Sequence, residues 1–163
     1  MIADFSQAEV QMSFFHWKIH KGKAFFYSEL LTTDLVTEYL MRVGSIPMHY
    51  IGFLGSSAKV TILIREGVSV SVAGTQVYAV NNNRSSTNTL ESLIYKGPAY
   101  TGGSIIRSNQ SGFGSSHGQA QSGTGGLDDE YVFKTNTDYV LTLTPSSSVD
   151  MVLNAVMYEA PVS

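Results

Sequence analysis

The feature that most constrains the fold of this chain is an alternation of apolar and polar residues with a period of two. Towards the C-terminal end, apolar residues occupy every second position: Val149, Met151, Leu153, Ala155 and Met157. Asp150 and Asn154 lie between them. Successive side chains of a β-strand point to opposite faces, whereas a helix repeats every 3.6 residues. The pattern therefore predicts a strand with one buried face.

Short segments of the same kind follow one another from residue 22 onward. They are rich in β-branched and aromatic residues and are separated by turn residues, at 24–31, 36–43, 47–54, 60–64, 68–72, 76–80, 131–133 and 139–144. We expect eight to ten strands, no long helix, and the side chains of Val60, Ile62 and Ile64 in the core. The turn at residues 145–148 predicts that the last two strands form a terminal antiparallel hairpin.

This spacing of strands favours an all-β fold over units that alternate strands and helices. Both ends of the region carry hydrophobic strands that must find partners, which favours an antiparallel jelly-roll β-sandwich with a long Gly/Ser-rich loop. We expect residues 20–163 to form this domain. Residues 109–126 are rich in glycine and serine, which bury little surface and are costly to order, so we predict a mobile loop at about 109–126.

Residues 1–19 do not follow the alternation. They contain a group of large apolar residues: Phe5, Met12, Phe14, Phe15 and Trp17. We expect this segment to be an N-terminal arm or an extra strand, with a short helix also open. Because apolar clusters outside a core usually mark contact surfaces, these five residues are the candidate interface with a partner protein or with a second subunit.

No catalytic constellation stands out, so we predict that the chain is not an enzyme and needs no cofactor. His16 and His20 have the spacing of a helical metal pair, but no glutamate follows the first histidine. Asp128, Asp129 and Glu130 lack the alternating oxygen ligands of a calcium loop and favour a solvated turn, so no metal site is predicted. A pair of carboxylates for glycoside hydrolysis needs only spatial proximity and is left open.

The surface is expected to carry little charge, since charged residues make up only 14% of the chain. A typical globular chain has about 25%. This composition favours contacts with other proteins. Lysine and arginine are scattered singly, which is unlike a nucleic-acid-binding surface. No apolar run approaches the roughly 20 residues of a membrane-spanning helix. We therefore predict neither a nucleic acid nor a membrane as partner.

Several blocks of the sequence together carry a resemblance. Residues 20–32 read HKGKAFFYSELLT, residues 64–67 IREG, residues 70–75 VSVAGT, residues 81–84 NNNR and residues 131–139 YVFKTNTDY, with Tyr158 and Glu159 at the end. Over residues 20–159 the chain resembles the jelly-roll capsid decoration, or cement, proteins of podovirus-type tailed bacteriophages. Turn residues recur in many β-proteins, but the order and spacing of the blocks are more specific.

The resemblance implies a structural virion protein that binds the outside of a phage capsid and stabilises it through protein–protein contacts. The implied partners are the major capsid protein and the chain itself, as a homodimer or homotrimer. The implied location is the capsid surface of the virion, assembled in the host cytoplasm. The alternative is a receptor- or glycan-binding jelly-roll module of a phage tail or head fibre, with the Gly/Ser-rich loop and neighbouring tyrosines as the binding site.

Overall fold

The computed structural model describes residues 14–112 and 125–160, and their side chains at 16–112 and 130–160. One helix, α1 (Phe14–His20), precedes the strands. The strands are β1 (Ala24–Thr33), β2 (Thr37–Arg42), β3 (Met48–Ser56), β4 (Val60–Val72), β5 (Thr75–Val77), β6 (Val80–Asn81), β7 (Leu93–Lys96), β8 (Ala99–Ser111), β9 (Gly125–Phe133), β10 (Asp138–Pro145) and β11 (Val149–Glu159). The expected all-β fold is confirmed.

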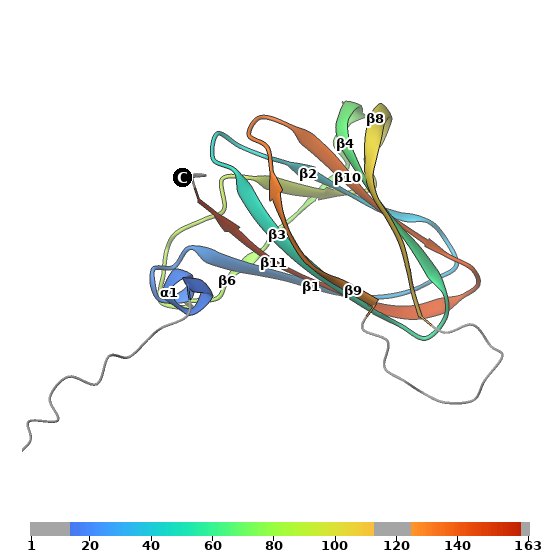
Figure 1. Cartoon of the computed structure of the whole chain (residues 1–163), viewed down its shortest axis with the longest axis horizontal. Helices are drawn as coiled ribbons and strands as arrows, with labels where there is room; N and C mark the ends of the chain where they lie inside the picture. The colour runs from blue at the N-terminus through green and yellow to red at the C-terminus, as the bar shows by residue number, and fades with distance from the viewer. Residues whose placement is uncertain (1–13, 113–124, 161–163) are drawn as a thin grey trace, which may run out of the picture.

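The strands form two antiparallel sheets packed face to face (Figure 1). Sheet A has the order β6-β1-β11-β3-β9, and sheet B has the order β5-β7-β2-β10-β4-β8. This confirms the predicted antiparallel sandwich. The main pairs are nested along the chain, because β1 pairs with β11, β2 with β10, β3 with β9 and β4 with β8. Such nesting is that of one long hairpin folded over on itself, which supports the jelly-roll interpretation.

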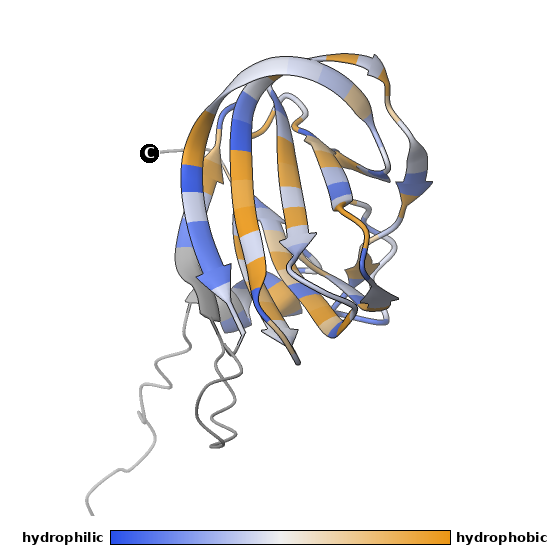
Figure 2. Cartoon of the chain, turned by 90° about the vertical axis from the view of Figure 1, so that its right-hand side faces the viewer, coloured by the Kyte–Doolittle hydropathy of each residue, from blue (hydrophilic) through white to orange (hydrophobic). Residues whose placement is uncertain are grey.

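The core lies between the sheets and is built largely from alternate residues of the longer strands, such as β3, β4, β10 and β11. Val60, Ile62 and Ile64 are fully buried, as the sequence predicts. The five alternating residues of β11 that begin at Val149 are buried as well. Figure 2 shows hydrophobic and hydrophilic positions alternating along several strands. Burial of one face of each strand therefore holds the two sheets together.

The predicted terminal hairpin is wrong. β10 pairs with β2 and β4 in sheet B, whereas β11 pairs with β1 and β3 in sheet A. The turn after Pro145 carries the chain from one sheet to the other. A short turn between two amphipathic strands is compatible with a hairpin and with a corner of the sandwich. Here each strand pairs on both sides within its own sheet, and both still bury their apolar faces in one core.

Other boundaries also differ from the sequence-based expectations. Residues 60–72 form one long strand rather than two, with irregular register against β8. Residues 14–20 form α1, not an additional strand, and residues 1–13 lie outside the described part. β8 extends to Ser111 and β9 begins at Gly125, so both ends of the expected loop belong to strands. Residues 113–124 lie outside the described residues.

Candidate docking surface on the outer face of sheet A

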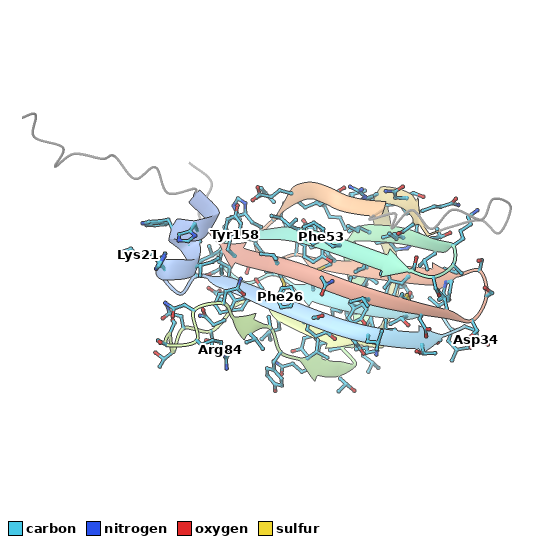
Figure 3. All side chains as sticks on the ribbon, turned by 90° about the horizontal axis from the view of Figure 1, so that it is seen from below. Lys21, Phe26, Asp34, Phe53, Arg84 and Tyr158 are labelled. Carbon is cyan, nitrogen blue, oxygen red and sulfur yellow. The ribbon has the colours of Figure 1, made fainter. Side chains whose placement is uncertain are left out.

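The outer face of sheet A is apolar over four strands. In one row across the sheet, Val80 of β6 pairs with Phe26 of β1, which pairs with Val156 of β11, which pairs with Ile51 of β3. A second row places Leu30 beside Val152. Figure 3 views this face and labels Phe26 and Phe53 on it. We call these residues, together with Phe53 and Val132, the sheet A face.

Several side chains of the sheet A face are exposed to solvent. Phe26 has an exposed fraction of 36% and Leu30 one of 70%, and Val80, Val132 and Val152 are exposed too. Between the two apolar rows, Ser28 donates a hydrogen bond to Asn154 over 2.7 Å, and beyond the second row Thr32 donates one to Asp150 over 2.6 Å. Contiguous exposed apolar surface rimmed by polar residues is typical of contact surfaces. This arrangement suits binding to another protein.

On the outer face of sheet B, other parts of the chain bury a central group of apolar side chains. Leu40 of β2 and Val140 of β10 point outward from the core and yet are fully buried. They pack with Val68, and Val70, Ala73, Tyr95 and Tyr100 complete the cluster. Above it, the Tyr100 hydroxyl donates a hydrogen bond to Glu38 over 2.7 Å. Sheet B therefore buries the apolar residues at the centre of its outer face within the chain, although Val72 of β4 and Ile105 and Ile106 of β8 stay exposed. Sheet A has no comparable cover over Phe26 and Leu30.

Helix α1 lies at one end of the sheet A face, beside β1 and Tyr158. The Lys18 side chain is almost fully buried, with its Nζ 5.4 Å from the centre of the Tyr158 ring and 5.5 Å from that of Trp17. These distances are those of cation–π contacts. The Lys18 carbonyl accepts a hydrogen bond from the Lys23 amide over 2.9 Å, which joins the helix to the start of β1. The pKa of Lys18 is lowered by burial and by the nearby charge of Lys23.

The structure describes only part of the interface predicted from the sequence. Trp17 has an exposed fraction of 41% and borders the sheet A face from α1. Phe14 and Phe15 belong to the same helix, but their side chains are not among those described. Phe5 and Met12 lie outside the described residues. The larger apolar surface on β1, β3 and β11 was missed by sequence reasoning, although residues 24–27 and 50–54 are apolar on both faces of their strands.

A polar cluster fastens β9 to its neighbours near α1. His49 Nδ1 and Glu130 Oε1 are 2.6 Å apart, and the Tyr158 hydroxyl donates a hydrogen bond to the same carboxylate. The His49 and Tyr158 rings stack with centroids 4.4 Å apart. Burial raises the pKa of Glu130, but the contacts with Tyr158 and His49 outweigh it and bring the pKa below its ordinary value. His49 is half-buried and partnered.

A second polar cluster lies on the inner side of β1. The Glu29 carboxylate accepts hydrogen bonds from the hydroxyl groups of Tyr27, over 2.5 Å, and Tyr39, over 2.6 Å, and it also pairs with Lys96 of β7. Burial raises the pKa of Glu29, but these hydrogen bonds outweigh burial and bring it below 4.5. Burial and the contact with Glu29 raise the pKa of both tyrosines. The cluster ties the edge of sheet A to sheet B.

The histidine pair of α1 is brought together by the helical spacing. His16 Nε2 and His20 Nε2 are 2.8 Å apart on the surface. No group of three or more metal-ligating side chains occurs among the described residues. The side chains of Asp128 and Asp129 lie outside that part, whereas Glu130 binds His49 and Tyr158. No helix in the described part of the chain is long and apolar enough to cross a membrane.

Comparison of the chain with protein-family models, with curated proteins and with solved structures finds no match.

Proposed function

We propose that this chain is a structural virion protein that binds the outside of a tailed-phage capsid and stabilises it through protein–protein contacts. The observation that carries the proposal is the contrast between the centres of the two outer faces: sheet B buries Leu40 and Val140 within the chain, and the sheet A face leaves Phe26, Leu30 and Val152 open. The major capsid protein is the proposed occupant of the sheet A face. The resemblance over residues 20–159 supplies the identity of this partner.

The chemistry of the sheet A face fits such a role. Exposed aromatic and aliphatic side chains on rigid strands lose little conformational entropy when they are buried by a partner. Aromatic residues at the centre of a contact commonly dominate its binding free energy. The polar pairs Ser28–Asn154 and Thr32–Asp150 already satisfy each other, so burying the face leaves few hydrogen-bonding groups without partners.

Binding of the purified protein to capsids that lack it tests the proposal. Phe26→Glu and Phe53→Glu place a carboxylate in the proposed contact, and each should weaken binding by roughly 30-fold or more, which is about 2 kcal/mol. Val72→Glu is the matched control, because Val72 is an exposed apolar residue of β4 in sheet B. Absence of binding by the unaltered protein contradicts the proposal. An equal loss in Val72→Glu would move the contact away from the sheet A face.

Copy number in purified virions separates the proposal from the alternative of a fibre module. A decoration protein should be present at the same order of copies as the coat protein, and a fibre module at far fewer. Glycan binding by the fibre alternative would involve residues 109–126, of which 113–124 lie outside the described residues. Binding to glycans at a copy number typical of fibres would favour the alternative.

A further inference from the structure

The edges of the two sheets are protected against pairing with other strands, with one exception. Long unprotected edge strands pair readily, and proteins limit this with short strands, charges, bulges or glycines. β5 has three residues and β6 has two. β8 has irregular register with β4 and contains Gly102 and Gly103 with positive φ. β9 carries three consecutive acidic residues after two glycines. Each of these edge strands is therefore poorly suited to pairing with a strand of another molecule.

β1 is the exception. β6 pairs with β1 only at Phe25 and Phe26, so no strand of the described chain pairs with that side of β1 from Tyr27 to Thr33. This seven-residue stretch contains no proline, glycine or lysine. Its one charge, Glu29, points inward, where Lys96 pairs with it. Figure 3 shows this open side of β1 between the labels Phe26 and Asp34.

One hydrogen bond shows which backbone N–H and C=O groups of β1 point to its unpaired side. The Ala24 carbonyl accepts from the Asn82 amide on the β6 side of β1. Successive residues of a strand present their N–H and C=O groups to alternate sides. Ser28, Leu30 and Thr32 therefore direct both backbone groups to the open edge. The same alternation places their side chains on the outer face, which agrees with the exposure of Leu30.

We propose that two copies of this chain join through the open edges of their β1 strands, antiparallel and centred on Leu30. In this register Leu30 lies opposite Leu30 of the second copy, and Ser28 lies opposite Thr32. Each of these residues then donates one backbone N–H and accepts at one C=O across the dimer axis. The contact is self-complementary, as a twofold axis requires.

The side chains of this edge favour a second copy as the occupant. The residues brought face to face are a pair of leucines and two pairs of hydroxyl residues, so no like charges meet. Leu30, an exposed leucine at the centre of a strand, gains an apolar neighbour in the second copy. The joined sheets also continue the sheet A face of one copy into that of the other. The proposal does not depend on the capsid, because the dimer forms from the chain alone.

Sedimentation equilibrium or light scattering over a concentration series tests the proposal. The unaltered protein should be a dimer, and Leu30→Lys should raise the dimer dissociation constant by at least about tenfold, since it sets two like charges opposite each other. Leu35→Lys is the matched control, because Leu35 also has an exposed fraction of 70% but lies in the turn after β1. Circular dichroism and melting curves check that both variants are folded.

Cross-linking gives a second measurement that avoids a charge. The chain has no cysteine, so Leu30→Cys introduces a single thiol. Directly opposite residues of an antiparallel pair have Cα atoms about 5 Å apart, so a short bismaleimide, which alkylates one thiol at each end, should join two Leu30→Cys copies. In the proposed dimer the two copies of residue 35 lie roughly 30 Å apart, and Leu35→Cys should not react in this way.

A monomeric unaltered protein would overturn the proposal. So would a dimer that persists unchanged in Leu30→Lys, or cross-linking that is as efficient from Leu35→Cys as from Leu30→Cys. None of these results bears on capsid binding, which the substitutions Phe26→Glu and Phe53→Glu test separately.

Discussion

Glu29→Gln should destabilise the fold by about 2–3 kcal/mol. The carboxylate of Glu29 accepts hydrogen bonds from the hydroxyl groups of Tyr27 and Tyr39, and it pairs with Lys96. Hydrogen bonds to a charged group contribute about 1.5–3 kcal/mol each, against about 0.5–1.5 kcal/mol for neutral pairs. The amide thus loses about 1 kcal/mol at each tyrosine. The side chain of Lys96 is 36% exposed and stays hydrated, so its pairing adds at most about 1 kcal/mol.

Urea unfolding followed by circular dichroism measures this change. With an m value of about 2 kcal/mol/M, the midpoint for Glu29→Gln should fall by roughly 1 M. Asp34→Asn is the control, because Asp34 is an exposed carboxylate in the turn after β1, and its free energy of unfolding should stay within about 0.5 kcal/mol of that of the unaltered protein. If Glu29→Gln is as stable as Asp34→Asn, the cluster does not hold β1 in place.

The pH dependence of stability gives a second, independent test of the role of the Glu29 carboxylate. The pKa of Glu29 is lower in the folded chain than its ordinary value of 4.5. A carboxyl group with a lowered pKa stabilises the fold above its unfolded pKa, and that stability is lost as the pH falls through the folded pKa. The difference in stability between the unaltered protein and Glu29→Gln should therefore narrow below about pH 4.5. A difference that is constant from pH 7 to acid would refute an ionised Glu29 as its source.

Three further predictions follow from the fold and the sequence. Ile62→Asp should prevent folding, because Ile62 is fully buried and a carboxylate there has no partner; a soluble, β-rich variant with an unchanged melting temperature would contradict the placement of β4. EDTA should leave the melting temperature unchanged, whereas a fall of several degrees would indicate calcium at residues 128–130. Deleting residues 1–13 should leave the sandwich folded and lower the affinity for capsids, and unaltered affinity would exclude a docking role for that segment.

Sequence periodicity predicted the inward faces of the strands well. The alternation places Val149 and Met151 in the core. The sandwich fixes this orientation, because a shift of one residue in the pairing of β11 would turn all its alternating apolar side chains towards solvent. Periodicity could not predict partners, because any two amphipathic strands can pair. The turn after Pro145 therefore suggested a hairpin, although β10 and β11 belong to different sheets.

The candidate docking surface was missed for a different reason. Phe25 and Phe26 are adjacent, and the sequence does not show which ring faces the core; in the structure Phe25 is buried and Phe26 is exposed. Apolar residues on both faces of a strand indicate either a buried central strand or a strand with a contact surface. Only the sheet order, with no layer of the described chain above sheet A, separates these two cases.

The two proposals make a joint prediction, because the twofold axis that relates paired β1 strands is perpendicular to the sheet. The sheet A faces of both copies then point to the same side and can rest on one underlying surface. A dimer that binds with two faces gains from effective concentration, commonly by about 10²–10⁴-fold in affinity. Leu30→Lys monomers should therefore bind capsids weakly, because they present a single face and because Leu30 is itself part of that face, and an artificial covalent dimer linked through Leu30→Cys should bind as tightly as the unaltered protein. Equal affinity of monomer and dimer would show that the two faces do not bind together.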